Sequence, residues 1–304
     1  SARADRGGPR VIRIDRNWLR DNPLPAIDAD TDKNARGRVL AVGGGLKCPG
    51  ALLLTGEAVL RSGAGKLQMA TVREAALALG VAMPEAGGIA LDTDEEGEID
   101  GPAAVRALGK AAGYSDAVVV GPGMSDSDPA LVTGLADALD GEGAMLIDAA
   151  AIGACKDCAS VVKALNGRAV LTPHPGEMAQ LTGEDAEAIA EDMEESARAA
   201  AERFGAVIVL KGPRTVIAAP GAEPLDYGGG GPGLATGGSG DVLAGIIAGL
   251  LAQGAEPALA AAWGVWVHGE AGSLVTTRLG GPGLLARELL TVVPELLHSS
   301  ATKG

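Results

Sequence analysis

Aromatic side chains are scarce in this chain. Phe, Trp and Tyr make up only 2% of its 304 residues, whereas hydrophobic residues of all kinds make up 47%. The interior must therefore be built from Ala, Val, Leu and Ile, whose small side chains let helices approach a sheet closely. Bases would find few rings on which to stack, which argues against binding of single-stranded nucleic acid.

Positive charge is also in deficit. Against 39 Asp and Glu residues stand 25 Lys and Arg residues, and the formal net charge is −14. Such a charge repels a phosphate backbone, so we expect no nucleic-acid partner. An acidic protein that binds phosphate must instead gather backbone N–H groups, a few cations and Mg²⁺ at one place.

Cysteine and long apolar runs are rare as well. Three cysteines are too few for a disulfide framework, which predicts a reducing, cytoplasmic location. Cys155 and Cys158 form a C-x-x-C pattern typical of a redox pair or half a zinc site, but no second pair completes it. The most apolar stretch, residues 242–267, is interrupted at Gln253 to Pro257, and no export signal opens the chain, so we expect no membrane association.

Short β-branched runs alternate with Ala- and Leu-rich stretches over most of the chain. This rhythm predicts an α/β fold with a mostly parallel central sheet and helices on both faces, in one domain spanning residues 1–304, in which residues 1–35 form an N-terminal arm or a short helix near Trp18. Strands are predicted at 38–42, 66–71, 117–120, 144–147, 169–171, 207–210 and 215–219. Helices are predicted at 50–61, 102–112, 129–139, 185–204, 241–252, 257–274 and 284–297.

Unusual residues follow several of these strands. They are Gly43 to Gly45, Gly121 to Gly123, Asp148, Thr172 to Glu177, and Lys211 with Gly212. In an open α/β sheet, ligands bind outside the carboxyl ends of the strands. We therefore expect these loops to converge on one crevice.

The strongest motif runs from Gly231 into the helix that follows Asp241. Six of the eleven residues before Asp241 are glycine. Free N–H groups at a helix start attract phosphate, so Gly238, Ser239 and Gly240 are predicted to form an anion hole. Asp241 beside it is the predicted catalytic base, and the alternative is that Asp241 merely caps the helix.

Two further residues complete a candidate phosphoryl-transfer site. Lys211 follows an apolar strand, where a cation can meet phosphate oxygens, although a surface lysine is the plain alternative. His174 stands between two prolines that fix its backbone, and it either contacts substrate or satisfies a neighbouring carbonyl group. Glu177 is predicted to cap a helix or to contact Mg²⁺ through water.

Three other patterns fail on spacing. Gly65-Lys66 lacks the rest of a P-loop, and no G-x-G-x-x-G follows a strand. Asp92, Asp94, Glu96 and Gly97 imitate the first half of a calcium loop, but Ala103 stands where the bidentate Glu belongs. A solvated surface loop is the prediction for 92–100.

Together these loops resemble those of the ADP/ATP-dependent NAD(P)H-hydrate dehydratases, which have a ribokinase-like fold. The resemblance rests on segments spread along most of the chain, which are 36–39, 49–51, 121–123, 171–177, 211–215, 237–241 and 252–254. It implies repair of hydrated NADH or NADPH (NADHX, NADPHX) with ADP or ATP as co-substrate, Mg²⁺, and a homo-oligomer, often a tetramer.

The resemblance also implies roles for single residues. Ala51, Gly123, His174 and Asp241 would contact the hydrated dinucleotide. The adenine nucleotide would be held by Lys211, Gly212, Pro213, Arg214, Thr215 and Gly240. The ring hydroxyl would be phosphorylated, with Asp241 taking its proton, and phosphate would then be eliminated.

Three positions depart from the family pattern. Ala150 replaces the second Asp of Asp-Ala-Asp, Gly231 replaces an Asn, and Gly45 replaces a common Ser. The resemblance then implies altered affinity for substrate or Mg²⁺. Two alternatives stay open: a small-alcohol kinase that releases a stable phosphoester, and a nucleotide-sensing protein without turnover.

Overall fold

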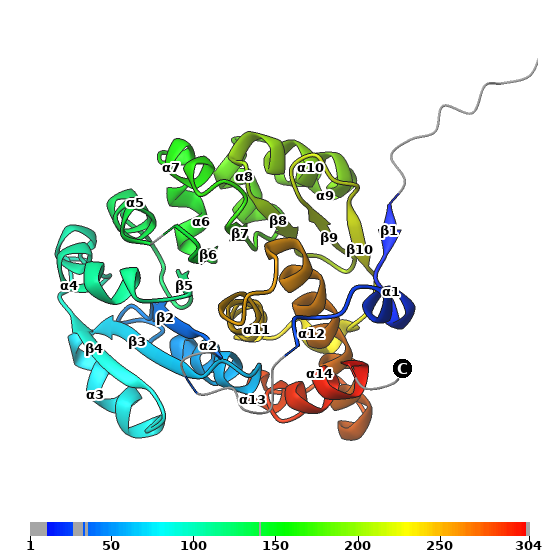
Figure 1. Ribbon diagram of the computed structural model, residues 1–304, viewed down its shortest axis with the longest axis horizontal. Helices are drawn as coiled ribbons and strands as arrows, with labels where there is room; N and C mark the ends of the chain where they lie inside the picture. The colour runs from blue at the N-terminus through cyan, green and yellow to red at the C-terminus, as the bar shows by residue number, and fades with distance from the viewer. Residues whose placement is uncertain (1–10, 27–32, 34–35, 140, 302–304) are drawn as a thin grey trace, which may run out of the picture.

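The chain folds around one ten-stranded sheet (Figure 1). The computed structural model describes residues 11–26, 33, 36–139 and 141–301. Across the sheet the strand order is β1-β10-β9-β8-β7-β6-β5-β2-β3-β4. The strands are β1 (Ile12–Arg13), β2 (Arg38–Val42), β3 (Lys66–Val72), β4 (Gly87–Leu91), β5 (Ala117–Val120), β6 (Ala144–Ile147), β7 (Ala169–Leu171), β8 (Val207–Leu210), β9 (Thr215–Ala218) and β10 (Leu225–Tyr227).

The sheet is mostly parallel, as predicted. Only β9 runs against its neighbours, β8 and β10. Every predicted strand is present, with β3 one residue longer and β9 one residue shorter than expected. The strands β1, β4 and β10 were not predicted because they are short or exposed: β4 begins with two glycines and buries only Leu91 fully.

Helices connect most of the strands. They are α1 (Arg16–Asp21), α2 (Gly50–Arg61), α3 (Arg73–Ala82), α4 (Gly101–Gly113), α5 (Pro129–Ala138), α6 (Ala150–Ala154), α7 (Ala159–Ala164), α8 (Pro175–Thr182), α9 (Ala186–Glu191), α10 (Met193–Phe204), α11 (Ser239–Ala252), α12 (Pro257–Leu279), α13 (Ala286–Leu289) and α14 (Val293–Ala301), with a 3₁₀ turn at Pro232–Leu234.

Several predicted helices differ in detail. The predicted helix at 185–204 is two helices, because Asp192 ends α9 and its carboxylate caps α10 through the Glu195 amide. The predicted helix at 284–297 is likewise divided into α13 and α14. The short helix near Trp18 is confirmed as α1. Strand β1 pairs with β10 and so joins the sheet, which means that the described part of residues 1–35 contains a strand and a helix.

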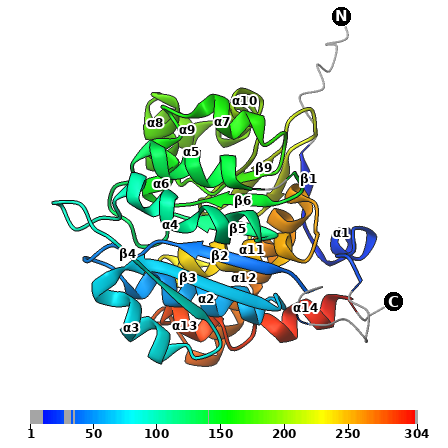
Figure 2. The ribbon, with the colours of Figure 1, turned by 60° about the vertical axis from the view of Figure 1, so that its left-hand side comes forward.

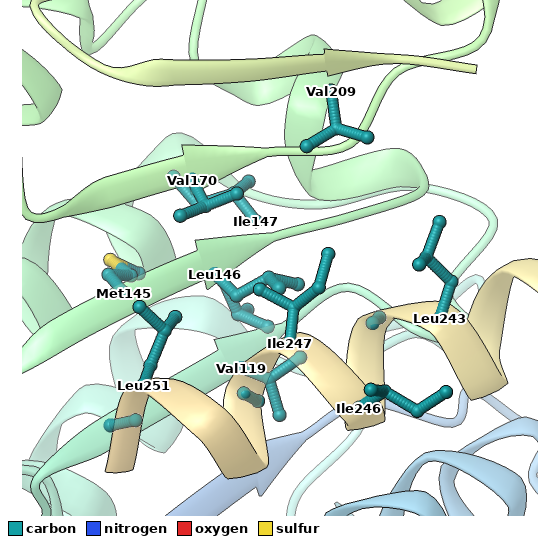
Figure 3. Packing of buried hydrophobic residues seen from close by; sticks show 14 of the residues in the cluster. Val119, Met145, Leu146, Ile147, Val170, Val209, Leu243, Ile246, Ile247 and Leu251 are labelled. Atoms are coloured by element: carbon teal, nitrogen blue, oxygen red, sulfur yellow. The ribbon is translucent and has the colours of Figure 1, made fainter. Parts of the chain in front are cut away.

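Helices cover both faces of the sheet. One face carries α4 to α10, and the other carries α2, α3 and α11 to α14 (Figures 1 and 2). Residues 242–252 of α11 are all buried, as expected of a helix that is apolar on every side. Figure 3 shows Leu243, Ile247 and Leu251 of this helix among the side chains of the central strands.

Helix α11 also packs closely on α2 through its own glycines. A β-carbon at Gly245 would collide with the Thr55 carbonyl oxygen, and one at Gly249 would lie 2.8 Å from the Val59 carbonyl oxygen. The close approach fixes α11 against α2, and with it the residues at the start of α11.

We expect Gly245→Ala to lower the free energy of unfolding by about 1–3 kcal/mol, because the added methyl group overpacks this contact. The matched control is Gly109→Ala in α4, where a β-carbon meets open space. There the same substitution should raise stability by about 0.5–1 kcal/mol, since alanine favours a helix. Urea unfolding of both variants measures the difference, and equal effects would contradict the packing account.

The acidic run at 92–100 forms a small turn rather than a calcium loop. Thr93 and Ile99 make an isolated antiparallel bridge, and the Asp94 carboxylate accepts hydrogen bonds from the Glu96 and Glu98 amides. Among the helices described, none is both long and apolar enough to cross a bilayer.

Candidate active site

The loops that follow the central strands lie against one another at the carboxyl edge of the sheet. The Gly44 amide donates to the Pro122 carbonyl at 2.8 Å, and the Gly45 amide to the Gly123 carbonyl at 3.1 Å. On the other side, the Lys211 amide donates to the Pro173 carbonyl at 2.8 Å. The predicted convergence of these loops is therefore confirmed.

Helix α11 begins with unpaired amides at this edge. Gly238 is its N-cap in the left-handed region (φ 88°), where glycine is favoured, and its carbonyl accepts from the Val242 amide. The Ser239 amide donates to the Thr236 carbonyl at 3.3 Å. The amides of Gly240 and Asp241 find no acceptor among the described residues, so they are the N–H groups most open to an anion.

Asp241 lies in the first turn of α11 and is not its cap. The N-cap is Gly238, and no side chain caps the helix, so the capping alternative is wrong. Asp241 is half-buried, and its burial, together with the nearby Asp148 carboxylate, raises its pKa to about 7 in spite of the opposing charge of Lys211. A carboxyl group with such a pKa can accept a proton near neutral pH.

Lys211 stands between carboxylates. Its Nζ is 3.1 Å from Asp148 Oδ1 and 3.6 Å from Glu177 Oε2, and its side chain is 21% exposed. Burial alone would lower the pKa of Lys211, but the two carboxylates outweigh it and the pKa is raised. Lys211 is therefore a charged ammonium group rather than a surface lysine. A β-carbon at Gly240 would lie 3.6 Å from this Nζ, so the cation borders the start of α11.

Asp148 interacts with both Lys211 and Thr172 in this site. Its side chain is buried, and Oδ1 accepts from Thr172 Oγ1 at 2.6 Å as well as from Lys211. The next residue, Ala149, has φ 50°, a conformation that costs a non-glycine residue about 1–3 kcal/mol. Ala150, one of the departures from the family pattern, is the first residue of α6.

A cavity of about 890 Å³ opens beside Lys211 and the start of α11. Several predicted nucleotide-binding residues line it together with His174 and Ser239, namely Lys211, Gly212, Pro213, Thr215 and Gly240. Gly231, where the family pattern has Asn, also lines this cavity and has φ 66°. Arg214 does not line it, because its guanidinium group pairs with Glu194 and Asp226 at 2.5 and 2.8 Å.

His174 caps helix α8 and is held by that role. Its Nδ1 accepts from the Gly176 and Glu177 amides, and Glu177 Oε2 accepts from the His174 amide, completing a capping box. The ring thus accepts from amides instead of satisfying a carbonyl group. Because Nδ1 is an acceptor, the proton of a neutral ring resides on Nε2, which lies 3.7 Å from Glu177 Oε1, and the half-exposed side chain lines the cavity.

The two small residues predicted to contact substrate lie next to each other. A β-carbon at Gly123 (φ 72°) would approach Ala51 Cβ to 2.7 Å and the Cys48 carbonyl oxygen to 2.5 Å. Ala51 is at the start of α2, which packs on α11. Neither residue lines the large cavity, so they belong to a different part of the crevice.

Sequence reasoning missed His268, which lies in the apolar α12 with no local motif to mark it. It is buried, and its Nε2 is 2.9 Å from Ser239 Oγ. Burial and the charge of Lys211 lower its pKa to about 4, although the bond to Ser239 opposes them. A neutral His268 imidazole therefore forms a hydrogen bond with the side chain of Ser239, the first residue of α11.

The two cysteines of the C-x-x-C pattern lie one turn apart around the start of α7 and are buried. Cys155 and Cys158 are buried free thiols, and each donates to a carbonyl group one turn earlier. No group of three or more His, Cys, Asp or Glu side chains among the described residues forms a ready metal cage.

Comparisons with known proteins show the family to which the chain belongs. The family model described as NAD(P)H-hydrate dehydratase matches residues 39–295. The chain is 43% identical over 293 residues to the ADP-dependent (S)-NAD(P)H-hydrate dehydratase of Xanthomonas campestris pv. campestris, which covers 95% of this chain and 97% of that protein.

Solved structures give the same result. The ADP/ATP-dependent NAD(P)H-hydrate dehydratase of Bacillus subtilis, co-crystallized with ATP/Mg²⁺, is 28% identical with a TM-score of 0.76, over 95% of this chain and 99% of that one. A ribokinase-like superfamily protein of Enterococcus faecalis V583 has a TM-score of 0.81 at 26% identity, over 96% of each chain. The fold is ribokinase-like, and the chain belongs to the NAD(P)H-hydrate dehydratase family.

Proposed function

We propose that this chain dehydrates NADHX or NADPHX to NADH or NADPH with ADP or ATP as phosphoryl donor, and that Asp241 is its base. The observation that carries this proposal is the position of a carboxyl group with a pKa of about 7 beside unpaired helix amides and a buried ammonium group. Transfer of a phosphoryl group to a hydroxyl group needs placement, charge neutralisation and a proton acceptor, and these groups supply all three.

The reaction has two steps. In the first step, Asp241 takes the proton of the ring hydroxyl, and the hydroxyl oxygen bonds to the terminal phosphorus of the nucleotide. The shortened nucleotide leaves with the electrons of the broken P–O bond. The carbon–oxygen bond then breaks, the ring nitrogen supplying electrons, and loss of a proton from the next ring carbon restores the double bond. Phosphate departs far more readily than hydroxide, which is why dehydration consumes a nucleotide.

The nucleotide would lie in the 890 Å³ cavity, with its phosphates at the start of α11. Lys211 is charged and its ammonium group lies beside Gly240, so it could neutralise phosphate oxygens there. Gly212, Pro213 and Thr215 line the same wall. Arg214 would contribute through its backbone, because its side chain is engaged elsewhere.

The residues around Lys211 also fit Mg²⁺ that enters with the phosphates. Mg²⁺ keeps several waters and takes one or two carboxylates plus phosphate oxygens. Asp148 and Glu177 provide carboxylates there, and the lack of a complete cage among the described side chains agrees with a shell finished by the nucleotide. Glu177 would act through water, because it also closes the capping box of α8. When bound, the ion would neutralise charge on the transferred group.

The dinucleotide would approach from the side of Ala51 and Gly123, two small residues that pack against each other. His174 would donate from Nε2 to its polar groups, since Nδ1 is occupied by two amides. Asp241 does not line the nucleotide cavity itself, but it directly follows Gly240, which does.

A pH dependence follows from the raised pKa of Asp241. The base must be deprotonated, so kcat/KM should rise with pH through about 7 and level off above it. The rate profile with a saturating nucleotide measures this midpoint. A profile already flat from about pH 5 to 8 would remove Asp241 as the base.

We also propose a cytoplasmic homo-oligomer, a tetramer by family resemblance. Two features support an interface between copies. Strand β4 lies at an edge of the sheet, and the neighbouring α3 carries Leu77 and Val81, which are 79% and 75% exposed. Paired edges and covered apolar side chains are what an interface between copies would provide. Sedimentation of the protein and of Leu77→Lys tests it, since loss of the larger species only in the variant supports this interface.

A further inference from the structure

Helix α12 is apolar where it is buried, except for His268, its only buried titratable side chain. His268 is 9% exposed and Ser239 is 5% exposed, and both residues line the nucleotide cavity. A polar group in apolar surroundings costs free energy unless it forms a hydrogen bond. The contact of 2.9 Å between His268 Nε2 and Ser239 Oγ supplies this bond, and it joins two residues of the cavity wall.

The Ser239 hydroxyl group has unused capacity for hydrogen bonds. A hydroxyl group can donate one hydrogen bond and accept two. Among the described residues, the Ser239 hydroxyl has a single partner, His268 Nε2. The Ser239 amide is engaged separately, because it donates to the Thr236 carbonyl. The direction of the bond with His268 therefore decides what the hydroxyl can offer to a ligand in the cavity.

The His268 ring is neutral near pH 7, because burial lowers its pKa to about 4. One of its two nitrogens then carries the proton. With the proton on Nδ1, the Ser239 hydroxyl donates to Nε2 and turns only lone pairs toward the cavity. With the proton on Nε2, the ring donates to Ser239 Oγ, and the hydroxyl proton is free. A phosphate beside the Lys211 ammonium group favours the second arrangement, because it then gains a charge-assisted hydrogen bond.

We propose that His268 is a positioning residue that directs the Ser239 hydroxyl proton at a phosphate oxygen of the nucleotide. The proposal rests on the proposed function, which puts the phosphates at the start of α11. Ser239 would be a further donor beside the Gly240 amide and the Lys211 ammonium group, all three residues being part of the cavity wall. A neutral imidazole orients this donor without placing a second positive charge near Lys211.

Calorimetric titration of the full-length protein with ADP, and separately with ATP, in MgCl₂ and without dinucleotide tests this role. His268→Leu removes the ring donor, and Ser239→Ala removes the hydroxyl group. We expect each to weaken nucleotide binding about tenfold or more, the scale of a hydrogen bond to a charged group. His268→Gln keeps an N–H donor at the distance of Nε2 from the backbone, so its affinity should stay close to that of the parent.

A double variant separates this role from a general effect on the fold. Because His268 acts through the hydroxyl group, adding His268→Leu to Ser239→Ala should cause no further loss of affinity. The matched control is Ser62→Ala in the residue that ends α2. Ser62 is also 5% exposed and its hydroxyl group donates to the Ala58 carbonyl, but it does not line the cavity. Its removal should leave nucleotide affinity unchanged.

Several results would overturn the proposal. Parental affinity in Ser239→Ala would show that the hydroxyl group meets no phosphate. Additive losses in the double variant, or equal losses in His268→Gln and His268→Leu, would show that His268 acts through the fold. If His268→Leu does not fold, His268→Asn replaces it, because its shorter side chain places the amide nearer Nδ1. A parent that binds neither ADP nor ATP would overturn the proposed function as well, whereas normal binding in all variants would overturn the role of His268 alone.

Discussion

Asp241→Asn is expected to lower turnover by about a hundredfold or more, the usual scale for losing a general base, while the nucleotide still binds. The amides of Gly240 and position 241 and the ammonium group of Lys211 remain in this variant, so affinity for ADP should change little. Steady-state kinetics and calorimetric titration with ADP measure the two effects.

The same variant should be more stable than the parent at about pH 8. In the folded protein the pKa of Asp241 rises from 3.8 to about 7, so the folded state binds the proton more tightly and loses stability as pH rises through this interval. Above about pH 7 the full cost is present, on the order of 2–4 kcal/mol. Asparagine has no charge to bury and escapes this cost.

Asp137→Asn on the exposed side of α5 is the control for both effects, and neither turnover nor stability should change appreciably. If Asp241→Asn keeps parental turnover, the base lies elsewhere. If the variant loses turnover but is no more stable than the parent at high pH, burial of the Asp241 charge does not lower the stability of the folded protein.

Lys211→Met should weaken nucleotide binding by about tenfold or more, since it removes a charge-assisted contact worth roughly 1.5–3 kcal/mol. It also leaves the buried Asp148 and half-buried Glu177 without their shared cation. Because Lys211 lowers the pKa of Asp241, its loss should move the midpoint of the pH–rate profile upward. Calorimetry with ADP and the pH profile of residual turnover measure the two changes.

Lys110→Met in the last turn of α4 provides the comparison, because this lysine is exposed and remote from the cavity. Unchanged ADP affinity in Lys211→Met would show that the phosphates do not lie beside α11. An unchanged pH midpoint would show that Lys211 and Asp241 do not interact.

The central strands were predictable because they are buried on both faces. Ala117–Val120 and Val207–Leu210 are continuous apolar runs, and every residue in them is buried. The strands at and near the sheet edges carry no such pattern. β1 has two residues, β10 has three, and β4 alternates little between buried and exposed positions, so their pairing depends on neighbours that the local sequence does not reveal.

The parts of the site that depend on a single segment of the chain were also predictable from the sequence. Glycines before α11 and the strand-end position of Lys211 were visible, and the structure gathers both at one cavity. Burial and the Asp148 carboxylate raise the pKa of Asp241 and Lys211 opposes them, and these residues come from other strand ends and meet Asp241 only in the folded chain. His268 was missed for the same reason, since its partner Ser239 lies 29 residues away.

The most direct test of this account is to mix the protein with hydrated NADH, Mg²⁺ and either ADP or ATP, and to follow the near-ultraviolet absorbance of NADH together with released phosphate. We expect NADH to appear with one of the two nucleotides and phosphate to be released in equal amount, and we expect Asp241→Asn to slow both signals by about a hundredfold or more. Absence of NADH with either nucleotide, or accumulation of a stable phosphoester in its place, would contradict it.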